Sequence, residues 1–320
     1  MAHYAGRMPL SRRSALALLA LGVTGCAGSP VIVGDPATAP PPEPEPPEPT
    51  RSTKAEAAHR SMAALAALIG SLVDSPHWEA QPWAVAARAQ CEDHVTRLAL
   101  PEPLEPQAQE PFPMEIRAVV PPSDATVAVN RLTAAVAQCV DALEEAAGEA
   151  EADEVRLLYT SMSTAVLGLH EQSIAPVEGE GAPRSLQPTT VEASLPILLG
   201  HVWALIYGLG VGLGRIDADD PLHALGTARL NAARTLRNDL RARLGADAPE
   251  QPAAFDLPTP MDNPEAVREA WGQLEVAVMN GYARLVAADA DPQWRIGMRN
   301  QVVPVQATGT ALTWWPGWLA

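Results

Sequence analysis

The sequence predicts an all-α protein built as two tandem four-helix bundles of ferritin-like topology, preceded by an export signal and a proline-rich tether. Hydrophobic residues make up 47% of the 320 residues, but they are mainly alanine, leucine and valine, and aromatic residues are only 4%. Alanine and leucine favour helices, and they recur here with a helical period. No run of alternating β-branched residues indicates a strand, and the two halves repeat one order of helical segments and connections.

The chain begins with the pattern of an export signal. Residues 7–26 read RMPLSRRSALALLALGVTGC, in which basic residues precede a short apolar run and small residues follow it. This order is typical of a cleaved signal peptide, and the apolar run is too short to span a bilayer. Arg12 and Arg13 resemble a twin-arginine export motif, but Ala15 follows where a leucine or aromatic residue is usual, so the Sec route stays open. Residues 1–25 are predicted to be the signal peptide.

The signal ends in Val23-Thr24-Gly25-Cys26, which looks like a bacterial lipobox. In such a motif the cysteine thiol is alkylated by diacylglycerol, and cleavage then leaves the cysteine N-terminal. Each buried methylene contributes about 0.8 kcal/mol, and stable anchoring takes two acyl chains, which a lipoprotein cysteine carries. Cys26 is therefore the predicted lipidation site, and it predicts a protein held on the extracytoplasmic face of the cell membrane. The alternative is a coincidental cysteine after a generic signal.

Residues 26–52 are rich in proline and glutamate and form the predicted tether. Such linkers stay extended at ~3.1 Å per residue, so the tether reaches roughly 80 Å. Removal of the signal takes three arginines and no acidic residue from a net charge of −16, which leaves −16 − 3 = −19. This charge argues against nucleic acid and against direct binding to anionic lipids. It leaves an envelope protein as a possible partner.

Eight helical segments follow the tether, four in each half. A long proline-rich connection separates the second and third segments of each half, at 100–122 and 246–263. A long crossover at this place lets the second and third helices run parallel, as in ferritin-like bundles. The predicted domains are 53–175 and 189–320. The predicted helices are 53–73, 77–99, 123–149, 151–174, 189–216, 221–245, 264–290 and 292–314.

The most apolar stretch, Leu195–Gly214, has twenty residues and no formal charge. Its length also fits a membrane span. Amphipathic segments that follow it could cover its apolar surface, which favours a buried core helix over a span.

Two cysteines of the first half, Cys91 and Cys139, lie on the predicted core faces of their helices. At a rise of ~1.5 Å per residue, their heights differ by about 3 Å if the two helices are parallel, and by roughly 12 Å if they are antiparallel. Outside the cytoplasm, two facing cysteines favour a structural disulfide. Two buried free thiols are the alternative.

The second half, from about residue 189 to 319, resembles the ferritin-like domain of unknown function found in actinobacterial lipoproteins. The resemblance is carried by His201 and Tyr207, by the arginine-rich second helix, and by the sequences QPAAFDLPTPMDNP, LEVAVMNGYARLVAA and TWWPGW. It implies a helical bundle and no assigned reaction.

A di-iron site is not expected in this half. Ferritin-like di-iron proteins take a glutamate from each of two helices and a Glu-x-x-His pair from each of the other two. Segment 221–245 contains no glutamate, segment 292–314 contains no acidic residue, and Gly200 stands before His201. We therefore predict no metal and no cofactor. A surface metal site at Glu56 and His59, with His94 and His170, is less favoured than solvated helix faces.

Two opposite charges fall on apolar faces of the second half. Arg229 lies on the leucine face of its helix, and Glu275 lies among Trp271, Val278 and neighbouring apolar residues. We predict an ion pair between them. One interpretation is a buried polar pocket formed by Arg229, Glu275, His201 and Tyr282 for an anionic ligand, and the favoured one is a satisfied core pair.

The sequence contains no nucleophile–base pair, phosphate-binding loop or ligand cluster. The predicted function is therefore a non-catalytic envelope lipoprotein that binds a partner or a small ligand. The alternatives are an enzyme or metal carrier with a site around His201 or between the bundles, and a structural spacer.

Overall fold

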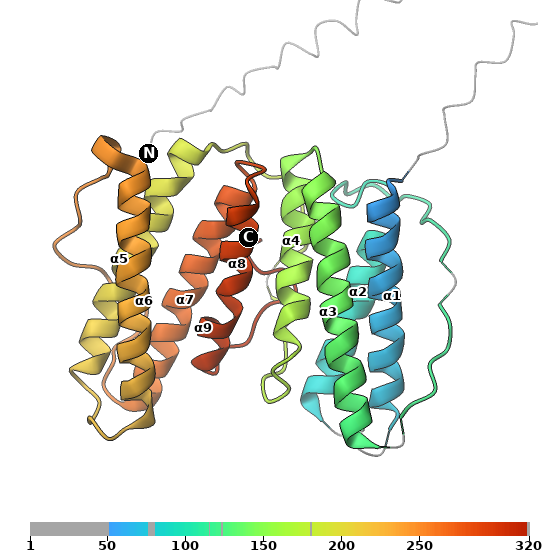
Figure 1. The fold of residues 1–320 in the computed structure, drawn as a ribbon, viewed down its shortest axis with the longest axis horizontal. Coiled ribbons are helices and arrows are strands. Elements are labelled where there is room, and N and C mark those ends of the chain that lie inside the picture. Colours follow the sequence, from blue (N-terminus) through green and yellow to red (C-terminus); the bar gives the residue numbers. More distant parts are fainter. Residues whose placement is uncertain (1–50, 76–80, 115, 123, 180, 319–320) are drawn as a thin grey trace, which may run out of the picture. The chain divides into compact units, whose positions relative to one another are not determined.

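The computed structural model describes residues 51–75, 81–114, 116–122, 124–179 and 181–318 (Figure 1). Arg12, Arg13 and Cys26 lie outside the described residues. The described chain is all-α, and its only strand-like feature is an isolated parallel bridge between Val177 and Thr313. The α-helices are α1 (Thr53–Val73), α2 (Pro82–Leu98), α3 (Ala125–Glu149), α4 (Asp153–Gly168), α5 (Val191–Leu213), α6 (Pro221–Leu244), α7 (Pro264–Val286), α8 (Pro292–Asn300) and α9 (Val302–Ala307).

Polar caps fix where most of these helices begin. The side chains of Ser52, Asp124, Thr190 and Asn263 each accept a hydrogen bond from the amide three residues on, which satisfies a donor that the helix itself leaves free. Proline follows the cap of α2, α6, α7 and α8, where its missing amide costs nothing.

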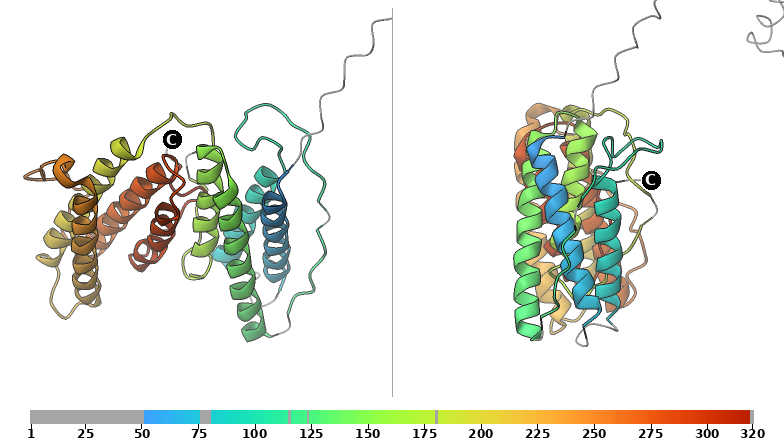
Figure 2. Two further views of the ribbon diagram at one scale, coloured as in Figure 1. Left: turned by 45° about the horizontal axis from the view of Figure 1, so that its top comes forward. Right: turned by 90° about the vertical axis from the view of Figure 1, so that its right-hand side faces the viewer.

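Helices α1 to α4 pack as one set, in which α1 contacts α2 and α3, and α3 contacts α4. Lys54 pairs with Glu145, so α1 and α3 are antiparallel. The start of α1 and the residues after α2 line one cavity, so α1 and α2 are antiparallel as well. It follows that α2 and α3 run in the same direction, and Figure 2 shows the long connection between them returning along the helices.

Helices α5 to α9 repeat this arrangement, in which α5 contacts α6 and α7, and α7 contacts α8 and α9. The indole of Trp271 donates to the carbonyl of Gly208 at 3.0 Å, and Gly281 lies against Leu198, so α5 and α7 are antiparallel. Trp271 also packs on Gly226 of α6.

Two glycines of α5 admit the side chains of α7. A Cβ atom at Gly208 would lie 2.3 Å from Leu274 Cδ1, and one at Gly212 would lie 2.6 Å from Trp271 Nε1. Among the described helices, α5 is long and apolar enough to cross a membrane, but half of its most apolar window is buried, and the core helix of a globular protein has the same composition.

The two sets of helices share one core. Their buried apolar side chains form a single cluster, and α4 contacts α7, α8 and α9. Arg156 of α4 donates to the carbonyl of Val286 at 3.0 Å, at the end of α7. A cation at this end complements the helix dipole.

The prediction of one helix over 292–314 is wrong. The helix breaks at Gln301, and α9 ends at Ala307, where the hydroxyl of Thr308 bonds the carbonyl of Val305 at 2.6 Å and Gly309 has φ +79°. A glycine with positive φ terminates a helix because it turns the chain away from the axis. The predicted helix over 151–174 also ends early, at Gly168.

Residues 308–318 lie against both sets of helices: Thr310 packs on Gly272 and Gly317 packs on Ala283 of α7, and other residues bond to the first set. The amide of Val177 donates to the carbonyl of Leu312 at 3.0 Å, and the amide of Trp314 donates to the carbonyl of Val177 at 2.8 Å. Ser161 of α4 donates to the carbonyl of Pro316 at 2.7 Å. The tryptophan-rich end of the chain therefore ties the two sets together.

Candidate functional site

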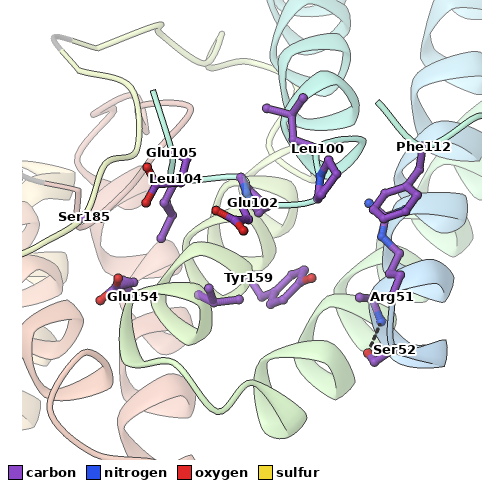
Figure 3. A pocket seen from close by; sticks show the side chains of 14 residues that line it. Arg51, Ser52, Leu100, Glu102, Leu104, Glu105, Phe112, Glu154, Tyr159 and Ser185 are labelled. Atoms are coloured by element: carbon purple, nitrogen blue, oxygen red, sulfur yellow. Dashed lines mark hydrogen bonds between the residues drawn. The ribbon is translucent and has the colours of Figure 1, made fainter. Parts of the chain in front are cut away.

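A cavity of about 330 Å³ lies where α1 begins, and Figure 3 shows it from close by. The start of α1 contributes Arg51, Ser52 and Ala55, and α4 contributes Glu154, Val155 and Tyr159. Ser185 comes from the segment after α4, and the remaining wall comes from the connection after α2. We call it the Tyr159 cavity. Its lining residues are Arg51, Ser52, Ala55, Leu100, Pro101, Glu102, Pro103, Leu104, Glu105, Phe112, Glu154, Val155, Tyr159 and Ser185.

Hydrogen bonds hold the connection wall in place. The side-chain amide of Gln109 donates to the carbonyl of Glu102 at 2.7 Å and accepts from its amide at 2.8 Å. Arg97 donates to the carbonyl of Pro103 at 2.8 Å, and the amide of Phe112 donates to the carbonyl of Ala99 at 2.8 Å. The first part of the long crossover is therefore a fixed wall of the cavity.

Arg51 is a positioned cation. Its guanidinium lies 4.6 Å from the centre of the Phe112 ring, a cation–π distance, and its Nη1 donates to Nδ1 of His59 at 2.8 Å. His59 accepts this bond as a neutral imidazole, because burial, and then the charge of Arg51, lower its pKa to about 4. Burial lowers the pKa of Arg51, and nearby Tyr159 and Glu56 act against that shift. An arginine keeps its charge in proteins.

Tyr159 lies at the centre of the cavity, between Arg51 on one side and Glu154 on the other (Figure 3). Its side chain is almost fully buried, with 7% exposure, and its hydroxyl has no hydrogen-bond partner among the described residues. Burial raises the pKa of Tyr159 and the charge of Arg51 opposes that change, so the hydroxyl stays protonated at neutral pH. The hydroxyl oxygen itself is not enclosed by the protein, so it is open to a hydrogen bond from a ligand in the cavity.

Three carboxylates, from Glu102, Glu105 and Glu154, face one arginine across an apolar wall. Figure 3 shows Glu105 and Glu154 on the side away from Arg51. This arrangement suits a small molecule with an apolar body and a basic amino group.

The predicted ion pair between Arg229 and Glu275 is present. Two hydrogen bonds of 2.6 and 2.7 Å join them, and Glu275 is buried, with 1% exposure. Gln301 completes the group: it accepts from Arg229 at 3.1 Å and donates to Glu275 at 3.3 Å. Both carboxylate oxygens are thus bonded within the protein, as in a satisfied core pair.

The structure brings Tyr282 near this pair but leaves His201 apart. Tyr282 is buried against Gly297, and burial raises its pKa while Arg229 lowers it. His201 is half-buried where α5 meets α7, with its Cδ2 3.2 Å from a Cβ built on Gly281. Burial and the charge of Arg284 lower the pKa of His201. The four residues of the predicted pocket therefore do not meet.

Cys91 and Cys139 are both fully buried and are free thiols in the structure. Burial raises the pKa of Cys91 well above its ordinary value, and it raises that of Cys139 to about 12 against a hydrogen bond from Ser61. The disulfide stays a prediction. As thiols, these side chains are protonated and unreactive.

The prediction that the protein holds no metal rests on the sequence, which lacks the di-iron ligand set. Within the described residues, no group of three or more histidine, cysteine, aspartate or glutamate side chains is placed to hold a metal. The assignment of His59 and His94 to solvated faces is wrong, because both are fully buried. His94 donates from Nε2 to the carbonyl of Trp314 at 2.8 Å, and its ring centre lies 4.5 Å from that of Trp315.

The residues of the Tyr159 cavity were missed by sequence reasoning. The available signal was the polar run from Tyr159 to Thr164, which interrupts an otherwise apolar helix. Arg51 gave no signal, since it falls within the predicted tether.

Comparison of the chain with protein-family models, with curated proteins and with solved structures finds no match. The resemblance to the ferritin-like domain of actinobacterial lipoproteins stays a prediction from the chain's own residues.

Proposed function

We propose that this protein is an envelope lipoprotein, anchored through acyl chains on Cys26, whose two ferritin-like four-helix bundles bind a small ligand without catalysing a reaction. Helices α2 and α3 run in the same direction, and so do α6 and α7, since Trp271 near the start of α7 packs on Gly226 near the start of α6; both directions support the two-bundle topology. The signal pattern, the lipobox and the tether support export and anchoring.

The unpartnered hydroxyl of Tyr159, inside a cavity that holds a fixed cation and three carboxylates, carries the ligand-binding part of the proposal. The proposed ligand is a small amine with an apolar body. Its amino group would pair with Glu102 and Glu154, and its body would lie against Leu104.

Native mass spectrometry of the full chain, exported to an oxidising compartment with Cys26→Ser to remove the acylation site, tests ligand binding. Extra mass on this protein is expected, and it should be lost when Glu102→Gln and Glu154→Gln are combined. Glu192→Gln is the control, because Glu192 is exposed and lies outside the cavity. Two results would exclude the Tyr159 cavity as the binding site. One is a protein without extra mass, and the other is extra mass that the combined Glu102→Gln, Glu154→Gln chain keeps just as the Glu192→Gln control does.

Membrane anchoring has a separate test. In cells, the wild-type chain is expected in the membrane fraction, and the Cys26→Ser chain in the soluble extracytoplasmic fraction. Equal membrane association of the two chains would refute the lipid anchor.

The alternative function is an enzyme or carrier with a site around His201. A catalytic histidine needs a carboxylate to orient its ring. The charge that acts on the pKa of His201 is the cation of Arg284 and not a carboxylate. Ligand binding is therefore the better-supported function.

A further inference from the structure

A second cavity, of about 200 Å³, lies where α4 and α7 meet, and it is separate from the Tyr159 cavity. Leu157 of α4, Ala283 and Ala287 of α7, and Leu186 form its apolar walls. The charged side chain that lines it is Arg284, and no acidic residue is among its lining residues. We call it the Arg284 cavity.

Arg284 differs from the other arginines of this region. Four partly or fully buried arginines each pair with a carboxylate: Arg156 with Asp153, Arg229 with Glu275, and both Arg295 and Arg299 with Glu144. Arg284 has no ion pair and no hydrogen bond among the described residues, and its Nε is buried without a partner.

An unpaired guanidinium nitrogen in an apolar wall is costly, and a bound anion would remove that cost. The neighbouring Gln187 is exposed and its amide has no partner among the described residues, so it could donate a second hydrogen bond.

We infer that the Arg284 cavity binds a small monocarboxylate with a short apolar tail. One guanidinium matches one carboxylate through two parallel hydrogen bonds. A phosphate dianion would bring a second charge that no other lining residue neutralises. A cavity of 150 Å³ holds benzene, so about 200 Å³ takes a molecule of six or so heavy atoms. Butyrate has this size and is the probe.

Butyrate and the uncharged butyramide are titrated into the full chain carrying Cys26→Ser, with binding followed by isothermal titration calorimetry and by the NMR signal of His201. Butyrate should bind at least ten-fold more tightly than butyramide. Because Arg284 lowers the pKa of His201, a carboxylate on Arg284 should raise that pKa. Butyramide should leave it unchanged.

Two variants test the assignment by different means. Arg284→Gln removes the cation and should weaken butyrate binding at least ten-fold, and Ala287→Leu should do the same by filling the cavity while Arg284 stays. Arg237→Gln is the control, because Arg237 bonds Asn238 on α6, away from this cavity. Circular dichroism melts establish that each variant is folded.

Equal binding of butyrate and butyramide, or butyrate binding that both cavity variants keep, would overturn the inference and leave Arg284 a solvated cation. The Glu102 and Glu154 variants should not change butyrate binding, so this site and the Tyr159 cavity can fail separately.

Discussion

Alanine at Gly212 should destabilise the protein, whereas alanine at Gly210, two residues earlier in the same helix, should stabilise it. A Cβ at Gly212 would lie 2.6 Å and 2.7 Å from two ring atoms of Trp271 and 2.7 Å from Val267 Cγ1. A Cβ at Gly210 would have no atom within 4 Å. Both changes gain up to about 1 kcal/mol of helix propensity, so that term cancels between the two variants.

The difference between the two variants therefore measures packing. Overpacking a core costs about 1–3 kcal/mol. Trp271 is fully buried, and moving its ring would also weaken its 3.0 Å bond to the carbonyl of Gly208, a contribution of about 1 kcal/mol. Gly212→Ala should thus be less stable than Gly210→Ala by about 2–4 kcal/mol.

Urea denaturation of the two variants and the wild type, followed by far-ultraviolet circular dichroism and tryptophan fluorescence, measures this difference. The wild-type midpoint should lie between those of the variants. A Gly212→Ala chain as stable as Gly210→Ala would refute the packing of α5 on α7 and revive a membrane-spanning role for α5.

Three further predictions concern buried polar groups. Burial lowers the pKa of His94 to about 4. As the pH falls, the unfolded chain therefore takes up the His94 proton at a higher pH than the folded chain does. The stabilisation of about 3 kcal/mol is complete above pH 6.5 and is lost as the pH falls toward 4. Urea midpoints of the wild type and of His94→Gln, measured over this pH range, will show the loss. Glu275→Gln should lower the free energy of unfolding by about 3–5 kcal/mol, and a combined Arg229→Met, Glu275→Leu chain should recover most of that loss in the same urea assay. A double variant no more stable than the single one would contradict a desolvation penalty at this pair. If Cys91 and Cys139 are thiols, iodoacetamide should label them only in urea. If the predicted disulfide forms, the intact mass should be lower by two hydrogens, and labelling should also require a reductant.

Sequence reasoning located most helices because their boundaries are local. The caps Ser52, Asp124, Thr190 and Asn263 act within three residues of themselves, so their effect can be read without a fold. The pairing of Arg229 with Glu275 was also accessible, because each side chain lies on an apolar helix face where an unpaired charge would be costly.

The last helix could not be predicted in the same way. Residues 292–314 have helical composition, yet the chain breaks at Gln301, where the side chain reaches back to Arg229 and Glu275. The segment after Ala307 lies against α4 and the loop at Val177 instead. Contacts with residues more than a hundred positions away outweigh local propensity here.

The sequence by itself determined the helical class, most helix starts and the buried ion pair, because helix propensity, capping and charge burial depend on near neighbours or on one face of a helix. Only the tertiary structure decided which side chains share a cavity. Arg51, Phe112 and Tyr159 lie far apart in sequence, and His201 is beside Arg284 rather than Glu275 because α5 meets α7 on the other face. Such groupings depend on how whole helices pack, and the spacing of residues along the chain does not reveal that packing.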